Sequence, residues 1–175
     1  MDDSSVNHVA EIMTVPLKLE EFLPYRLNVV ASLTSQALSR IYADRYGIGV
    51  PEWRVLVTLG QYGMMTGKAI GAHSHMHKTK VSRAVAFLEK RKLLTRRTNR
   101  ADLRESFLSL TPNGLAIYHD LAPIALDFAR RLVEAIEPAD RAAFNRAVDR
   151  LTERSTQLAA EITNGAPKNK KNKSP

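Results

Sequence analysis

The chain has 175 residues and a formal net charge of +8, with 44% hydrophobic and 25% charged residues. This length and composition are typical of a soluble globular protein that can bury a core, and the absence of cysteine excludes disulfides, thiol nucleophiles, iron–sulfur clusters and thiolate zinc sites. No apolar run approaches the length of a membrane span, about 18 residues, and residues 1–7 do not resemble a signal peptide. We therefore expect a cytoplasmic, nucleoid-associated protein that does not bind membranes.

The positive charge is concentrated in one segment of the chain. Residues 64–114 contain 11 Lys and Arg against 3 Asp and Glu, whereas residues 1–63 and 115–167 are each slightly acidic. A basic segment attracts polyanions, because each neutralised phosphate releases a condensed counterion. A solvated basic face with no partner remains the simpler alternative.

Helical spacing of apolar residues predicts four helices in the first half of the chain, over residues 24–46, 51–60, 66–73 and about 78–90. Gly47 ends the first of these helices, and Gly60 and Gly63 close the second. Pro51 suits a first helical position, and Thr66 is a good N-cap for the third helix.

The pattern then changes from helical to alternating. Two strands are predicted over residues 93–98 and 106–110, joined by a polar tip into a hairpin. Two long helices follow, one capped by Thr111 and running to Ile136, the other opening at Glu137–Pro138 and ending near residue 162. We expect residues 1–18 to form a flexible arm and residues 164–175 a disordered basic tail.

The fourth predicted helix has an unusual outward face. If Val81, Val85 and Leu88 face the core, helical periodicity places small hydroxyls, one methyl and one guanidinium on the opposite side. Small side chains allow a helix to enter the major groove deeply, and arginine can bridge guanine O6 and N7. The predicted DNA-binding residues of this helix are Lys78, Thr79, Lys80, Ser82 and Arg83.

The hairpin carries the second group of basic residues. Arg96 and Arg97 lie near its base, and Arg100 and Arg104 lie near its tip. A narrow minor groove attracts an inserted arginine through its negative potential, so we predict DNA contacts from Arg97, Arg100 and Arg104. Asp102 is predicted to fix the tip by binding backbone amides or a neighbouring guanidinium.

Three segments in order resemble the MarR-type winged helix-turn-helix transcriptional regulators. The sequence Asp102-Leu103-Arg104, followed by Leu108-Ser109-Leu110-Thr111-Pro112-Asn113-Gly114, is similar to the D-x-R and L-T-x-x-G pattern of the family wing. The stretches 51–56 and 80–85 are similar to the start of its second helix and to its recognition helix.

The resemblance implies a mainly α fold with a small β-hairpin wing. A winged helix-turn-helix at about residues 51–112 would be flanked by N- and C-terminal dimerisation helices at about 22–46 and 112–163, within one domain spanning residues 19–163. It also implies a homodimer on a pseudo-palindromic operator, acting as a repressor that a small ligand releases. The first helix looks most like members that control the breakdown of aromatic acids, some of which sense acyl-CoA thioesters. The ligand would then be an aromatic acid or its CoA thioester.

Three positions depart from the family pattern. Lys92 stands where a glycine is common, so a left-handed cap there would cost about 1 kcal/mol unless the helix ends differently. Leu103 replaces a frequent second arginine in the wing. His77 replaces the acid or serine that often caps the recognition helix, which leaves its cap open.

An acidic effector would require a cation and an aromatic wall. The candidate ligand residues are Tyr25, Arg26, Asn28, Trp53 and His75. Equally, Trp53 could belong to the core and Arg26 could pair with an acid of the partner subunit. The spacing His73-x-His75-x-His77 spans a helix end and a turn, so we expect no metal site there.

Two other classes of function fit the sequence less well. The segment 63–69 fails the phosphate-loop spacing, and neither GxSxG nor GxGxxG nor HExxH occurs, so we expect neither an enzyme nor a cofactor. A nonspecific architectural protein would share the basic charge but would show no sequence preference. The sequence favours a regulator with three partners: an operator in double-stranded DNA, a second copy of the chain and a small effector.

Overall fold

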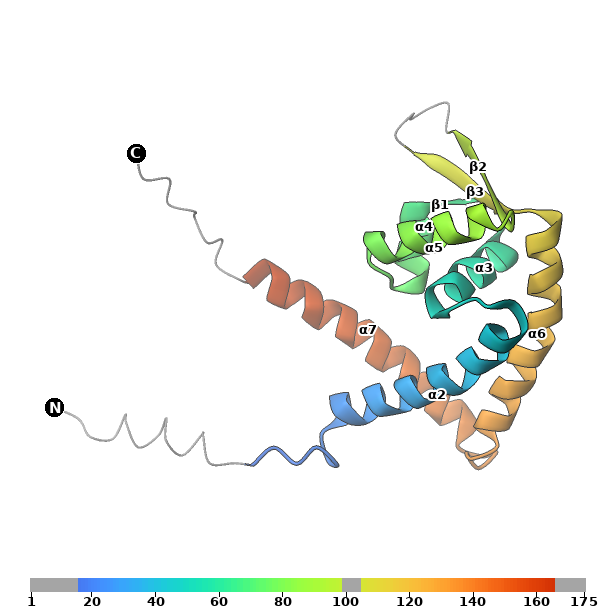
Figure 1. Cartoon of the computed structure of the whole chain (residues 1–175). Helices are drawn as coiled ribbons and strands as arrows, with labels where there is room; N and C mark the ends of the chain where they lie inside the picture. The colour runs from blue at the N-terminus through green and yellow to red at the C-terminus, as the bar shows by residue number, and fades with distance from the viewer. Residues whose placement is uncertain (1–15, 99–104, 166–175) are drawn as a thin grey trace, which may run out of the picture. The chain divides into compact units, whose positions relative to one another are not determined.

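The computed structural model describes residues 16–98 and 105–165, which contain six helices and three strands (Figure 1). By contacts the chain divides into two compact units, with the boundary between Ala125 and Leu126. The predicted arm at 1–18 and the predicted tail at 164–175 lie almost entirely outside the described residues. No helix in the described part of the chain is long and apolar enough to cross a membrane.

The helices of the first unit begin and end where local chemistry predicts. Helix α2 (Leu23–Tyr46) ends at Gly47, whose φ of 59° is the left-handed conformation that glycine adopts without strain. Helix α3 (Val50–Tyr62) starts with Pro51 in its first turn, and the Glu52 carboxylate accepts the amide of Gly49 at 2.9 Å. Helix α4 (Gly67–Ser74) is capped by Thr66, whose hydroxyl accepts the amide of Ala69 at 3.2 Å.

The second predicted helix is longer than expected. It passes through Gly60 and ends at Gly63, because Gly60 serves packing rather than termination. A Cβ at position 60 would lie 2.5 Å from the ring of Tyr118, so the absent side chain allows α3 to approach the following helix α6 (Pro112–Val133).

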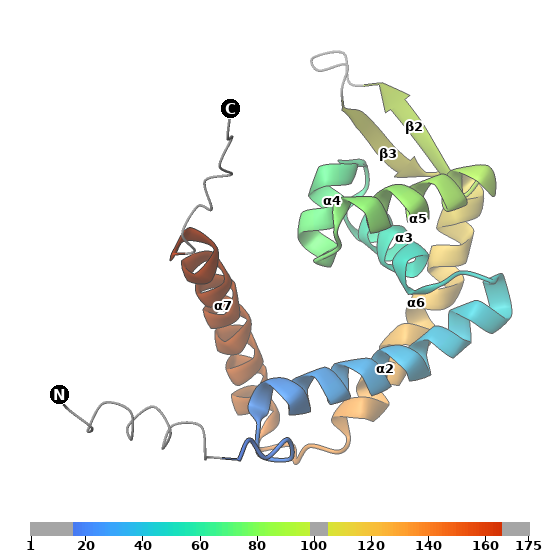
Figure 2. The same cartoon turned by 60° about the vertical axis from the view of Figure 1, so that its left-hand side comes forward.

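Helix α5 (Lys78–Lys90) is followed by a three-stranded antiparallel sheet in the order β1-β3-β2. Strands β2 (Leu94–Thr98) and β3 (Ser106–Leu110) form the predicted hairpin, with Arg96 opposite Leu108. Strand β1 (Met65–Thr66) was not predicted: it is two residues long, and it pairs with β3 at Met65–Leu108. Figure 2 shows the β2–β3 hairpin extending beyond α5.

The core of the first unit is formed by α2, α3, α4, α5 and the sheet, together with the first half of α6. Trp53 stacks on Tyr42 with ring centroids 5.3 Å apart, which joins α3 to α2. The fully or nearly buried apolar residues of this core include Ile48, Leu56, Leu59, Ile70, Leu88 and Leu121.

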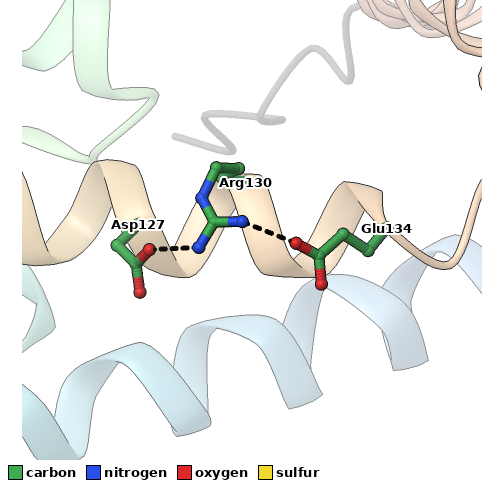
Figure 3. Close-up of polar contacts among 3 residues, drawn as sticks. All are labelled: Asp127, Arg130 and Glu134. Carbon is green, nitrogen blue, oxygen red and sulfur yellow. Dashed lines mark hydrogen bonds and ion pairs between the residues drawn. The ribbon is translucent and has the colours of Figure 1, made fainter.

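The second unit holds the end of α6 and helix α7 (Arg141–Gly165). Here Arg130 bridges Asp127 and Glu134 with ion pairs of 2.6 Å each, which stabilises the last turns of α6 (Figure 3). These carboxylates raise the pKa of Arg130 above its ordinary value, the hydrogen bond to Asp127 contributing most. Helix α7 begins at Arg141, later than the predicted opening at Glu137–Pro138, because residues 138–140 form a turn in which the Asp140 amide donates to Glu137.

Candidate nucleic-acid interface

Helix α5 separates its side chains into a buried face and an exposed face. Val81, Ala84, Val85 and Leu88 are buried, as the helical spacing predicts. The opposite face is solvent-exposed and carries Thr79, Ser82, Arg83 and Ala86, with Lys80 and Phe87 exposed beside it. The helix therefore offers short hydroxyls, a methyl and one guanidinium to whatever lies outside the core.

The first turn of α5 breaks the usual rule for helix N-termini. Acidic residues are favoured there because the helix dipole is positive at that end, yet this turn contains Lys78 and Lys80 and no acid. His77 supplies the N-cap, its ring Nδ1 accepting the amide of Thr79 at 3.3 Å. Two ammonium groups beside the positive end of the helix dipole together create an anion-attracting end.

The connection between α4 and α5 is held by specific contacts. His75 ends α4 in the left-handed conformation with φ of 50°, and the Met76 amide donates to the Gly71 oxygen at 3.0 Å. Arg54 of α3 donates to the main-chain oxygen of Ser74 at 3.3 Å. These contacts fix the turn of the helix-turn-helix and thereby the direction in which α5 leaves it.

The two neighbouring arginines of the wing have different surroundings. Arg96 donates to the carboxylate of Glu89 on α5 through Nε at 3.4 Å and Nη2 at 3.3 Å, so it joins β2 to the recognition helix. Arg97 points to the other face of the strand, is exposed, and has no ion pair within residues 16–98 and 105–165. Of the predicted wing residues, Arg100, Asp102 and Arg104 lie outside the described part of the chain.

A groove of about 650 Å³ lies between α4, α5 and the wing. Its rim carries Lys68, Lys78 and Arg96, with Ser82 on the α5 side. Lys68 is not among the residues predicted to bind DNA. Its one available signal was its position within the basic segment, next to the Thr66 cap of α4.

The candidate ligand residues do not form one site in this structure. Trp53 is 8% exposed and lies in the core against Tyr42. Tyr25, Arg26 and Asn28 are exposed in the first turns of α2, about 21–26 Å along the helix axis from Tyr42. His75 is exposed at the end of α4.

The three alternating histidines have separate roles within the described residues. His73 packs against the ring of Tyr62, with centroids 4.5 Å apart, while His75 and His77 occupy helix ends. No group of three potential metal ligands comes together in residues 16–98 and 105–165.

Comparisons with known proteins agree with this geometry. The sequence profile of the MarR family matches residues 48–106, from the start of α3 to the wing. Among curated proteins, none matches the chain.

Solved structures share the fold over most of the chain. A MarR/EmrR family transcriptional regulator from Acinetobacter sp. ADP1 is 23% identical, with a TM-score of 0.73 over 81% of this chain and 99% of that one. A MarR family transcriptional regulator from Silicibacter pomeroyi DSS is 26% identical, with a TM-score of 0.68. The match covers 82% of this chain and 96% of that one. BpsR of Bordetella bronchiseptica, whose DNA binding is regulated by 6-hydroxynicotinic acid, is 20% identical, with a TM-score of 0.62. The match covers 73% of this chain and 98% of that one.

The profile match covers the helices and wing that carry the exposed basic residues, and the structural matches extend over the long helices on either side. Residues 48–106 therefore form a MarR family winged helix-turn-helix segment, and the chain shares the fold of MarR family transcriptional regulators over most of its length.

Proposed function

We propose that the protein is a sequence-specific repressor, which binds a pseudo-palindromic operator as a homodimer and is released by a small ligand. The observation that carries this proposal is the exposed face of α5, where Arg83 stands among side chains too short to keep the helix away from base edges. A nonspecific binder needs only positive charge and gains nothing from such a face.

Each group of residues has a distinct role in this proposal. Thr79, Ser82 and Arg83 read base edges or nearby phosphates in the major groove, and Lys78 and Lys80 contact phosphates. Arg97, Arg100 and Arg104 act at the minor groove, and Asp102 orients the wing, as the family motif implies.

Exposed apolar side chains on the long helices support the homodimer. On α7 such residues recur at alternating spacings of four and three, with Ser155 filling one position of the repeat: Phe144, Val148, Leu151, Leu158 and Ile162. A repeat of this kind is typical of a helix that packs along another helix. Leu27, Val30 and Leu33 of α2 are also exposed, between 45% and 61%, and would be covered in a dimer.

An aromatic acid or its CoA thioester is the proposed effector class. Tyr25, Arg26, Asn28 and His75 are exposed and chemically suited to a carboxylate and a ring, whereas Trp53 is buried against Tyr42. The regulation of BpsR by 6-hydroxynicotinic acid, itself an aromatic acid, supports this class.

The test of DNA reading starts from DNA selected out of a random pool by the wild-type protein. Fluorescence anisotropy with excess random competitor then compares Arg83→Ala with Arg131→Ala, a control that removes an exposed arginine from α6. We expect Arg83→Ala to relax the base preference and the control to leave it intact. A uniform loss over all sequences would make Arg83 a phosphate contact, and wild-type binding abolished by competitor would indicate an architectural protein.

The wing and the effector are tested with the same DNA. Arg104→Ala should weaken binding by at least about tenfold without affecting the oligomer, and unchanged binding would remove the wing from the mechanism. A panel of aromatic acids and their CoA thioesters should contain a compound that releases the DNA. Release by none of them would reject this effector class.

The homodimer is tested by sedimentation of two α7 variants. Leu158→Arg places a charge in the apolar repeat, whereas Ala160→Arg places the same charge elsewhere on the exposed surface of α7. We expect Leu158→Arg to dissociate the dimer and the control to retain it. A wild-type protein that sediments as a monomer would disprove the proposed dimer.

A further inference from the structure

The C-terminal end of the recognition helix is connected to two other helices through a single tyrosine. Arg91, the C-cap residue of α5, donates from Nη1 to the main-chain oxygen of Tyr46 at 2.5 Å. Tyr46 is the last residue of α2, and its hydroxyl donates to Oδ2 of Asp120 on α6 at 2.9 Å. Arg45 donates to the same carboxylate oxygen at 3.2 Å.

Both bonds of Tyr46 satisfy groups that need partners. The last carbonyl oxygens of a helix receive no hydrogen bond from an amide of the same helix, and a cation is favoured at that end. The Arg91 guanidinium is therefore a suitable cap for α2. The Asp120 carboxylate receives two donors from consecutive residues of α2. All four residues belong to the first compact unit, so the connection lies within one part of the chain.

We infer that Tyr46 is a positioning residue, which fixes the direction of α5 relative to α2 and α6. In the homodimer proposed above, on which this inference rests in part, the same contact fixes the separation of the two recognition helices and hence the preferred spacing of the operator half-sites.

The exposure of the ion pair and the length of α5 indicate that these contacts position α5 more than they stabilise the fold. Side chains of the Arg45–Asp120 pair are 53% and 44% exposed, and ion pairs this exposed add little to the free energy of unfolding. A helix of 13 residues is about 20 Å long, so a tilt of about 10° pivoting at Arg91 moves the first turn by about 3 Å. That displacement is close to the rise of one base pair, about 3.4 Å.

The first measurement does not depend on DNA or on the dimer. Because the sequence has no cysteine, spin labels can be placed uniquely at the exposed positions Ala86→Cys on α5 and Ala116→Cys on α6. Labelled chains are mixed with excess unlabelled protein, so that only distances within one chain are recorded. We compare Tyr46→Phe, which removes only the hydroxyl, with Tyr62→Phe, which removes a hydroxyl from a tyrosine that is 51% exposed.

We expect the distance distribution to broaden or shift in Tyr46→Phe and to stay unchanged in Tyr62→Phe. An unchanged distribution in Tyr46→Phe would overturn the inference. Combining Tyr46→Phe with Asp120→Ala should change nothing beyond Asp120→Ala alone, since that variant already removes the Tyr46 bond together with the Arg45 pair. A further change in the double variant would contradict the proposed path.

The second measurement uses the selected operator and two versions lengthened or shortened by one central base pair. We expect Tyr46→Phe to lose about fivefold of the discrimination between the original and altered spacings, equivalent to about one hydrogen bond. Equal weakening on all three DNAs, with a lower unfolding temperature, would mean a merely structural role. If the wild type sediments as a monomer, the dimer proposal fails, and the label distances alone decide the role of Tyr46.

Discussion

The hydroxyl of Thr111 donates to the main-chain oxygen of Lys92 at 2.8 Å. The same hydroxyl accepts the amide of Gly114 at 3.1 Å, so one side chain both caps α6 and holds the turn after α5. A Cβ at Gly114 would collide with the carbonyl oxygen of Leu93, which explains the glycine of the L-T-x-x-G motif. This motif therefore joins the recognition helix, the wing and α6 at one point.

Replacing Thr111 by valine should lower the free energy of unfolding by about 1–2 kcal/mol, because both bonds of the hydroxyl are lost while the shape is kept. Urea unfolding measures the change. Thr111→Ser should retain most of the stability, and Thr95→Val, at an exposed position of β2, serves as the control. Equal stability of wild type and Thr111→Val would show that these two hydrogen bonds contribute nothing to the free energy of unfolding.

Replacing Lys92 by glycine should raise the free energy of unfolding by about 1 kcal/mol. Lys92 has φ of 57°, so of the two alternatives open from the sequence the left-handed cap is the one that occurs, and glycine adopts it without steric cost. Thermal unfolding of Lys92→Gly and Lys92→Ala separates the backbone effect from loss of the ammonium group. A gain in both variants would assign the effect to charge instead.

Gly60→Ala should destabilise the protein by about 1–3 kcal/mol, despite the better helix propensity of alanine, because the added methyl overlaps the ring of Tyr118. Gly67→Ala is the matched control, since the nearest atom to its added Cβ would be 4.0 Å away, on Val81. Chemical denaturation of both variants provides the test. A loss of equal size in the two variants would show that the α3–α6 contact is not its cause.

The protein should lose stability in alkali partly through Tyr46. The hydrogen bond to Asp120 raises the pKa of the Tyr46 phenol above its ordinary value of 10.0, because a phenolate would lie against a carboxylate. Its contribution is complete below pH 10.0 and is lost as the pH rises through the raised pKa of the folded state. Burial likewise raises the pKa of Tyr42.

Unfolding free energies of wild type and Tyr46→Phe between about pH 9 and pH 11 isolate the contribution of Tyr46 ionisation to stability, since Tyr42 titrates in both proteins. The wild type should decline more steeply. Parallel curves would mean that Tyr46 titrates alike in the folded and unfolded states.

Arg97→Gln should weaken DNA binding and reduce its dependence on salt by about one phosphate contact, because its guanidinium is exposed and unpaired within the described residues. Arg96→Gln should leave the salt dependence nearly unchanged, since Arg96 already pairs with Glu89. Anisotropy titrations over a series of salt concentrations distinguish the two. The reverse order of salt effects would exchange their roles.

The helices and the hairpin were predictable because each depends on local chemistry. Thr66 and Gly47 mark helix ends by capping and by left-handed geometry, and Val81 and Val85 repeat with the helical period. Strand β1 escaped prediction because two residues carry no periodicity, and its pairing with Leu108 depends on a contact distant in sequence. Gly60 was wrongly predicted to end its helix, because its packing partner, Tyr118, cannot be inferred from neighbouring residues.

Within the candidate site, the exposed face of α5 was easier to predict than the surroundings of the arginines on β2. The exposed face of α5 follows from helical periodicity, and the structure places Thr79, Ser82 and Arg83 there. The distinction between Arg96 and Arg97 depends on Glu89, seven residues earlier on another element, so adjacent identical residues could not be separated by sequence. The DNA and ligand roles of all these residues stay predictions.

Because the first turn of α5 is basic, bound DNA would also stabilise the folded state of this turn. Without a polyanion, Lys78 and Lys80 lie beside the positive end of the helix dipole, so the turn is less stable than an acidic one would be. Bound phosphates cancel that repulsion, and a partner that binds only the folded state raises its stability by mass action. The free protein should therefore fray at residues that we propose contact DNA, and operator binding should protect the backbone amides of this turn from hydrogen exchange.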